Sequence, residues 1–508
     1  MLRAPGAPRA RTRLWILLTV PALACSPALR GYDVAPNGLA RSDARLRSML
    51  AVGHADSALT RLLPAERGLA PTDAVLRLLY QGTVAYYAGD YARSVSSLDS
   101  AVWLADDRTV ARVSREAAAL LSNDRAIPYE PDRNERLFSA YYAALGYLRM
   151  DDPTEAAVEA RRISFILENL DEDLDAREAP LYGVLRYMSG VLYELAGNGI
   201  DAAVAYRNAS ALLPSLAEPA TLTGDTGEVV LFIEDGFVAH RVQHSLTIVL
   251  GSDEHDRLHD HDRDVRRLAA DELAMRVLAS AFAPANEYGV GPQTGRRDWF
   301  VPAPDRPKRP RCRDASKTEA ADTTRGPAPD SARAARSSRR SKPRTDCDDD
   351  DRTYILRMAW PAYHADRRPA SSARILRSDS SDVAAPVFAS INDAVLAQHE
   401  RDRPAMLARM IARSAAKYAL VKGAEDIGGD DNNGIGRLLG AIANISTAVL
   451  EQADTRSWTL LPGSIGVARI RLPEGTHDLA LAVGDRLVEL PGVQVKRGRV
   501  RVDAVRVW

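Results

Sequence analysis

Residues 190–214, GVLYELAGNGIDAAVAYRNASALLP, decide how the N-terminal half of the chain folds. The positions that matter are Gly190, Tyr193, Gly197, Ala202, Tyr206, Ala209 and Pro214. The small residues let two helices approach closely, and the two tyrosines fill the space between them. Pro214 ends the second helix because proline lacks an amide donor. The stretch therefore predicts two antiparallel helices joined by a short turn.

The same spacing recurs upstream. A first copy consists of Gly82, Gly89, Tyr91, Ser94, Leu98 and Ala101, and a weaker second copy of Ala144, Tyr147, Ala156, Ala160 and Ile163. These offsets match the tetratricopeptide (TPR) unit, and a half-copy at Gly53, Ala58 and Leu62 precedes them. A generic helical bundle with Ala and Gly at its helix crossings is the alternative. Stacked TPR units form a curved surface whose concave side typically binds a peptide or protein.

The composition limits what the chain can be. Its 508 residues can hold about two or three domains, and an apolar fraction of 46% is enough for a core. The 67 basic and 68 acidic residues nearly cancel, which argues against a nucleic-acid-binding protein.

Residues 1–24 have the features of an export signal. Four arginines between residues 3 and 13 precede a short apolar run at 14–23, and Cys25 follows. We expect Cys25 to be lipidated after cleavage, which would anchor the chain to a membrane. Residues 25–70 would then form the anchor linker and the first helices. The alternative is a plain signal-peptidase site that releases a soluble protein. The expected location is the periplasmic side of a bacterial membrane, in particular the outer membrane.

The hydrophobic period changes after the repeat domain, which is expected over residues 71–220. Residues 227–250 predict a β-hairpin that turns at Glu234-Asp235-Gly236, within an opening region at 221–301. Residues 302–351 are rich in Pro, Ala, Ser, Arg and Asp and predict a disordered insert. Cys312 and Cys347 lie in this insert, and two leftover cysteines in an exported chain suggest a disulfide.

Residues 352–508 predict helices followed by strands. A strand at 354–360 is expected to end at Pro361, and a helix at 386–400 is followed by a second helix that starts at Asp402 and Pro404. Residues 457–508 predict strands only, which suggests a small sandwich that the strands near 229 and 354 could join. The expected fold class is α+β: a TPR-like α-solenoid, then a β-rich, sandwich-like C-terminal domain with helices and a long disordered insert.

Aromatic residues beside a Pro-containing loop are candidates for partner binding. Tyr129 follows Pro128, and Phe138, Tyr141 and Tyr142 lie on the next predicted helix. These side chains could line a groove, although such residues more often belong to the core.

A second candidate site is basic. Arg409, Arg413 and Lys417 are spaced by four residues, which aligns them on one face of a helix. The stripe would either pair with acids of the same chain or bind an anionic ligand such as a phosphate or glycan.

Patterns for metals and catalysis are weak. His255, His259 and His261 alternate with aspartates at a helix start and favour a solvated loop over a metal site. Residues 428–434 lack the ligand spacing of a calcium-binding EF-hand. No nucleophile lies with a base, and although Asp124 with Glu159 could be invoked as a carboxylate pair, acids are common on TPR surfaces. We therefore predict neither catalysis nor a metal or cofactor.

Several motifs together resemble a family of TPR-containing bacterial envelope lipoproteins. They are Asn123-Asp124 with Pro128-Tyr129; Val158-Glu159-Ala160-Arg161-Arg162; Glu234-Asp235-Gly236-Phe237-Val238; Ala359-Trp360-Pro361; the helix of Arg409, Arg413 and Lys417; and Ala453-Asp454-Thr455-Arg456-Ser457-Trp458 followed by Leu461-Pro462. The resemblance implies an exported lipoprotein with repeats and a β-rich end, and it suggests a role in envelope assembly. It implies no activity.

The motifs of this resemblance contain candidate surface contacts, namely Arg161, Arg162, Arg456 and Trp458. The structural alternative is that Asp454 pairs with Arg456 and that Trp458 packs under the sheet.

Three functions compete. An adaptor would hold an envelope protein partner in the TPR groove while Cys25 fixes the complex to a membrane. A module that binds a glycan or another anionic polymer would use the basic helix and the β-rich end. A hydrolase would need a catalytic arrangement that we do not find. We predict the adaptor, with no nucleic-acid partner.

Overall fold

The computed structural model describes residues 35, 37–62, 71–109, 127–168, 174–220, 224–250, 288–290, 297–301, 354–368, 370, 372–377, 382–427 and 452–508, with a few residues between 257 and 272. Several expectations lie outside these residues: the export signal, Cys25, the insert with Cys312 and Cys347, the three histidines at 255–261 and the loop at 428–434. No helix in the described part combines the length and hydrophobicity that a membrane span requires.

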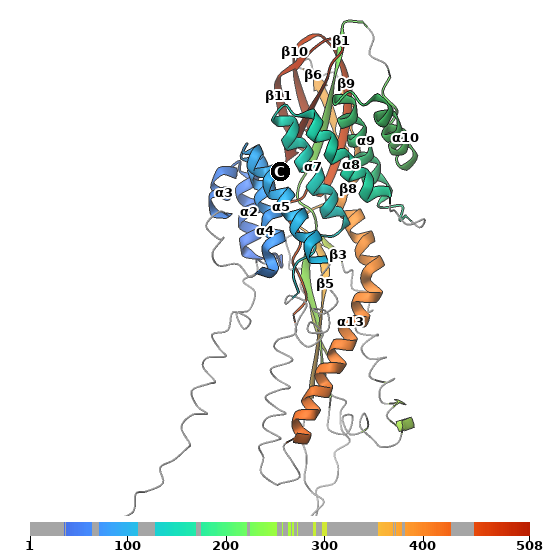
Figure 1. Cartoon of the computed structure of the whole chain (residues 1–508). Coiled ribbons are helices and arrows are strands. Elements are labelled where there is room, and N and C mark those ends of the chain that lie inside the picture. The colour runs from blue at the N-terminus through green and yellow to red at the C-terminus, as the bar shows by residue number, and fades with distance from the viewer. Residues whose placement is uncertain are drawn as a thin grey trace, which may run out of the picture.

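Pairs of antiparallel helices form the N-terminal part of the described chain (Figure 1). They are α2 (Arg41–Ala51) with α3 (Ala55–Leu62), α4 (Ala74–Tyr87) with α5 (Tyr91–Thr109), α7 (Arg133–Arg149) with α8 (Pro153–Glu168), and α9 (Ala179–Leu195) with α10 (Gly199–Leu212). A short 3-10 helix, η3 (Pro71–Asp73), precedes α4. The three predicted TPR-like copies and the half-copy therefore each correspond to one helix pair.

Each pair is closed by the same turn. Gly53, Gly89, Asp151 and Gly197 adopt left-handed backbone, with φ of 76°, 80°, 60° and 81°. The amide after each of them donates to the carbonyl five residues back; that of Asn198, for example, donates to Tyr193 at 2.8 Å. Glycine adopts this conformation without strain, so a glycine at this position of a repeat indicates a turn. The second copy has Asp151 at this position, which is one reason why its pattern is weaker.

Small residues bring the paired helices together as expected. A Cβ atom on Gly82 would lie 2.6 Å from Leu98 Cγ, and one on Gly190 would lie 2.6 Å from Tyr206 Cε1. Both contacts join the first helix of a pair to the second at the same place in the repeat. The first helices and second helices therefore pack too closely for any larger side chain at these positions.

The β-rich part contains a four-stranded sheet next to the repeats. Its order is β12 (Val500–Val507), β1 (Thr226–Asp235), β9 (Ser464–Pro473) and β8 (Val387–Ser390). β1 is parallel to β12 and antiparallel to β9, with Phe232 opposite Val467. A second sheet has the order β11 (Arg486–Val495), β10 (Gly475–Val483), β6 (Arg374–Arg377) and β7 (Asp382–Ala384). Leucines and valines from both sheets share one hydrophobic cluster.

The third sheet corrects the predicted hairpin. β2 (His240–Leu250) does not pair with β1; it lies between β5 (Tyr354–Ala365) and β4 (Arg297–Val301), and β3 (Tyr288–Val290) borders β5. The strand at 354 likewise continues through Pro361, which lies opposite Gln243. Among the described strands, β3 reaches only residues 363–365 of β5, so Pro361 has a partner strand on one side only. A proline is tolerated there because one edge makes no ladder of hydrogen bonds.

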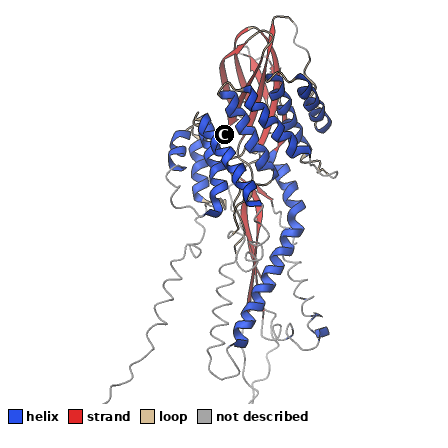
Figure 2. Ribbon diagram, in the orientation of Figure 1, coloured by secondary structure: helices blue, strands red, loops and turns tan. Residues whose placement is uncertain are grey.

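The two helices predicted around residue 400 are one. α13 (Ile391–Ile427) runs through Pro404, and residues 387–390 before it are strand β8. α13 lies beside β5 and extends away from the repeats (Figure 2). Met410 of this helix packs with Leu246 of β2 and Trp360 of β5, which gives the helix an apolar seam beyond the proline.

One hydrophobic core joins the repeats to the first sheet. It runs from Leu46 in α2 through the repeat helices to Phe232 in β1 and Val467 in β9. The first helix of each pair faces this core, and nearly every residue of α9 from Leu181 to Tyr193 is buried. The inner face of the repeats is therefore packed against the protein's own β-rich part.

Candidate functional site

The predicted groove residues lie inside this core. Tyr129, Phe138, Tyr141 and Tyr142 are all buried. Tyr141 packs edge to face on Phe232 of β1, with ring centroids 6.1 Å apart. These aromatic side chains therefore contact the protein's own sheet and do not line an open groove, which corrects the interpretation of this set as a partner site.

A segment of the C-terminal half fills the place where a TPR ligand would bind. Residues 453–461, ADTRSWTLL, are called the Trp458 segment here. Trp458 is 1% exposed. Its indole Nε1 donates to Thr83 Oγ1 of α4 at 3.0 Å, and its backbone amide donates to Glu135 Oε1 of α7 at 2.7 Å. The segment thus crosses the first helices of two neighbouring repeats.

Arg456 fixes the same segment to the base of the repeats. Its guanidinium donates to both carboxylate oxygens of Asp454 at 2.8 Å and to Asp73 at 2.8 Å. It also donates to the carbonyl oxygen of Ile127 at 2.8 Å. The alternative in which Asp454 pairs with Arg456 is therefore confirmed, and both Arg456 and Trp458 are internal rather than surface contacts.

The carboxylate of Glu135, which accepts the hydrogen bond from the Trp458 amide, is held in place at the capped start of α7. Asp132 and Glu135 form a capping box, each side chain accepting from the other residue's backbone amide at 3.0 Å. The hydroxyl of Tyr129 also donates to Glu135. Burial and the nearby Asp132 charge raise the pKa of Glu135 to about 7. The side chains of Tyr129, Asp132 and Glu135 therefore bind the Trp458 segment and cap the start of α7. They do not form an arrangement of nucleophile and base.

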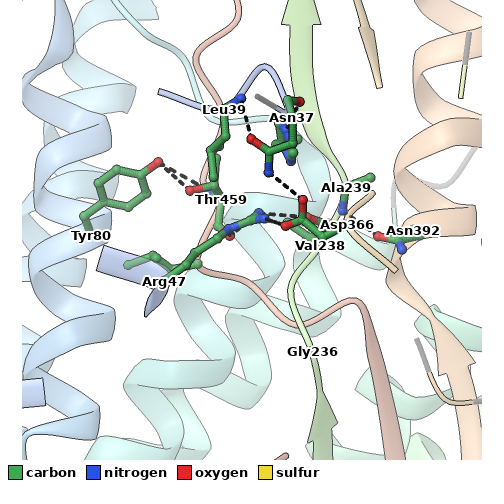
Figure 3. A network of polar contacts seen from close by, with 12 residues as sticks. Asn37, Leu39, Arg47, Tyr80, Gly236, Val238, Ala239, Asp366, Asn392 and Thr459 are labelled. Carbon is green, nitrogen blue, oxygen red and sulfur yellow. Dashed lines mark hydrogen bonds and ion pairs between the residues drawn. The ribbon is translucent and has the colours of Figure 1, made fainter. Parts of the chain in front are cut away.

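A buried arginine on the first helix pair makes a second junction (Figure 3). Arg47 of α2 donates to the carbonyl oxygens of Thr459 and Val238 at 2.6 and 2.8 Å and pairs with Asp366 at 2.9 Å. Asn37 donates to the other oxygen of Asp366. One side chain thereby ties α2 to the Trp458 segment, to the link between β1 and β2, and to the end of β5.

A third buried arginine joins the sheet to the repeats. Arg506 of β12 lies 3.4 Å from Glu234 of β1 and donates to the hydroxyls of Tyr87 and Tyr142 at 3.1 and 3.2 Å. Its side chain also lies over the ring of Trp508, 4.6 Å from the centroid. Buried charges are costly unless paired, so these three arginine junctions fix how the sheet sits on the helices.

The other predicted contacts are placed as follows. Arg161 is exposed on α8, whereas Arg162 pairs with Glu159 at 3.0 Å and with Asp99 of α5 at 3.5 Å. On α13, Arg409 is exposed but Arg413 is 3% exposed, and the side chain of Lys417 is outside the described part. Arg409 and Arg413 therefore do not form one open basic stripe, because Arg413 is buried.

Exposed apolar residues on the outer helices were missed in the sequence. Trp103 of α5 and Phe165 of α8 are 69% and 68% exposed, and Ile200 of α10 is 84% exposed. Trp103 falls outside the buried stripe of Val95, Leu98, Ala101 and Ala105, and that offset was the available signal. Within the described part of the chain no group of three or more potential metal ligands comes together.

No protein-family model and no curated protein matches the chain. Among solved structures, the chain is similar to the MamA RS-1 ArsTM double mutant (16% identity, TM-score 0.24), over 34% of this chain and 74% of that one. It is also similar to MamA (17%, 0.22; 33% and 74%) and to a Podosopora anserina kinesin light chain with nearly identical TPR-like repeats (14%, 0.19; 34% and 94%). The repeat assignment itself rests on this chain's four equivalent turns and helix contacts.

Proposed function

We propose that this protein is an exported scaffold of the bacterial cell envelope, anchored through a lipid on Cys25, that binds a protein partner and serves in envelope assembly. The observation that supports the proposal is the joining of the helix pairs to the β-rich part through one core and three buried arginines. A repeat array held in this way offers a fixed surface, which lowers the entropic cost of binding a partner.

The partner surface differs from the one expected. Because the Trp458 segment and strand β1 occupy the inner face, we place the partner on the outer helix α10, where Ile200 is 84% exposed. A fragment of residues 71–220 would expose Phe138, Tyr141 and Tyr142 to water and bind apolar surfaces unspecifically.

We also infer that the first two sheets form the sandwich expected for the C-terminal domain. Val229, Leu231 and Ile233 of β1 point into the cluster that Leu479 and Leu481 of β10 share. The basic-helix alternative has less support, since Arg413 is buried.

Site-specific photo-crosslinking in cells tests the proposal. A photoreactive residue in place of Arg207, at an exposed position of α10, should link the full-length chain to one envelope protein. The same residue in place of exposed Leu487, on β11, should not give that product. Identical products from both positions, or no product from position 207, would count against the scaffold role.

Anchoring is tested separately by Cys25→Ser. The substituted protein should leave the membrane fraction, and a labelled fatty acid should be incorporated only by the natural chain. A membrane-bound Cys25→Ser protein would show that another feature holds it there.

A further inference from the structure

The two largest exposed aromatic side chains on the outer helices occupy the same place in neighbouring repeats. Trp103 lies as far beyond Gly82 as Phe165 lies beyond Ala144. Both are more than two thirds exposed. Large exposed apolar groups that gather in one place mark interaction sites more often than isolated ones do.

The helix directions and one ion pair put these two aromatic residues at the same level of α5 and α8. The start of α7 meets the end of α5, where Arg136 pairs with Asp106 at 2.7 Å, and the end of α7 meets the start of α5, where Gly146 approaches Val95. α5 is therefore antiparallel to α7, and since α8 turns back on α7, α5 and α8 run in the same direction. Asp99 of α5 and Arg162 of α8 bridge the two helices at 3.5 Å.

Trp103 and Phe165 each come one turn after this bridge, in the same direction. We call the surface formed by Trp103, Phe165 and their exposed neighbours Arg161, Asp107 and Glu168 the Trp103–Phe165 patch.

The charges of the patch are arranged with opposite signs at its two ends. Arg161 precedes Phe165 by one turn, whereas Asp107 and Glu168 follow the aromatic residues by about one turn. A surface with one sign at each end matches a copy of itself turned end to end, as in the isologous contact of a two-fold dimer. The two carboxylates beside the aromatic residues disfavour an anionic membrane as the occupant.

We propose that the Trp103–Phe165 patch is a self-association surface on which a second copy of this chain docks about a two-fold axis. In this dimer the helices α5 and α8 of the two copies face each other in antiparallel directions. Trp103 and Phe165 form its apolar centre, and Arg161 of each copy faces Asp107 and Glu168 of the other. The inference is independent of the proposed scaffold function and holds whether or not a further partner binds.

Sedimentation equilibrium of the purified full-length chain tests the dimer. The natural chain is measured at about 100 µM, roughly one hundred times a micromolar dissociation constant. Nearly all chains should then be dimeric, and the measured mass should be close to twice that of one chain. Trp103→Glu and Phe165→Glu should each give the mass of one chain. Ile200→Glu is the matched control, because it places the same charge at an exposed apolar position of α10 outside the patch and should leave the dimer intact. Unchanged circular dichroism and Tm would show that the substituted chains are folded.

A charge exchange tests the orientation of the two copies. Arg161→Glu should raise the dissociation constant at least about tenfold, because it places like charges opposite each other. Adding Asp107→Arg and Glu168→Arg to the same chain should return the dissociation constant to that of the natural chain. If Arg161→Glu had weakened the dimer by unfolding the chain, two further substitutions would not restore dimerisation.

A natural chain that remains monomeric at this concentration would overturn the proposal. The same holds if the monomeric chain binds anionic vesicles and loses that binding in Trp103→Glu, since the occupant of the patch would then be a membrane. A dimer that persists in Trp103→Glu and Phe165→Glu would overturn it as well, since another surface would then hold the copies together.

Discussion

The indole nitrogen of Trp458 donates a 3.0 Å hydrogen bond to the hydroxyl of Thr83, two residues that are far apart in the sequence. Thr83 directly follows Gly82, the small residue that lets α4 approach α5. The first helix of this repeat therefore uses one face to pack its own partner helix and another to bind the Trp458 segment. In this protein the surface with which a TPR array commonly binds a separate peptide has become part of the internal packing.

Trp458→Ala should strongly destabilise the protein. It removes a buried indole and the hydrogen bond that Thr83 accepts from it, while the Thr83 hydroxyl still donates to the Leu79 carbonyl. The change is expected to lower the free energy of unfolding by about 3–5 kcal/mol. Urea denaturation followed by circular dichroism measures this loss. Leu487→Ala, at an exposed position of β11, should change the value by less than about 0.5 kcal/mol. Similar losses in both proteins would mean that the Trp458 segment does not hold the repeats.

Arg456 should not be replaceable by lysine. The guanidinium satisfies Asp454, Asp73 and the Ile127 carbonyl at once, and an ammonium group cannot reproduce that planar fork. We expect both Arg456→Lys and Arg456→Gln to destabilise the fold, the latter by about 3 kcal/mol, because a buried pair loses one member. The equivalent changes at Arg207, an exposed position of α10, serve as controls in the same thermal melts. A tolerated lysine at position 456 would contradict the role of the fork.

Two glycines should respond to alanine in opposite ways. At Gly190 the new Cβ would lie 2.6 Å from the Tyr206 ring, and the resulting overpacking should cost about 1–3 kcal/mol. At Gly199, the first residue of α10, the Cβ would meet nothing within 4 Å. Gly199→Ala should therefore be neutral or stabilise the protein by up to about 1 kcal/mol. Equal effects in chemical denaturation would contradict the close approach of α9 and α10.

Glu159 should make the fold less stable as the pH rises. Burial raises the pKa of Glu159 from its ordinary value of 4.5 to about 7, although the charge of Arg162 opposes this shift. Between these two values the unfolded chain has lost the proton while the folded chain still holds it. The folded state binds more protons in this window, so stability falls with increasing pH.

Comparison with Glu159→Gln isolates the contribution of this residue. From pH 4.5 to pH 8 the natural chain should lose up to about 3 kcal/mol relative to Glu159→Gln, given 1.36 kcal/mol per pKa unit. Urea denaturation at several pH values measures the difference. Parallel curves for the two proteins would show that Glu159 titrates normally. Glu135 has a raised pKa of the same sign, but it is present in both proteins and cancels in the comparison.

The helix pairs could be predicted because their determinants are local. Gly89 and Gly197 set the turns, and Gly82 and Gly190 face residues of the very next helix. The predicted hairpin at 227–250 was wrong for the opposite reason. Strand β1 forms its backbone hydrogen bonds with β9 and β12, which lie near the end of the chain. Alternating apolar residues do not specify which strand will be the partner.

The candidate site was predictable only in part. From the sequence, aromatic side chains such as Tyr141 and Tyr142 could belong to the core or line a groove. The position of Phe232 in the folded chain decides that they belong to the core. Arg409 and Arg413 share a helix face by spacing, yet Arg413 is buried and Arg409 is exposed. Neighbours that are distant in sequence decide burial, and helical periodicity contains no information about them.

By itself the sequence determined the antiparallel helix pairs and most of the C-terminal strands, because turn glycines, small packing residues and alternation act over a few residues. The tertiary structure alone decided that the inner face of the repeats is filled by Trp458 and its neighbours, and that Trp103 and Phe165 remain outside. The physical reason is that buried arginines such as Arg47 and Arg456 need partners from several parts of the chain at once, and only the folded chain brings those parts together.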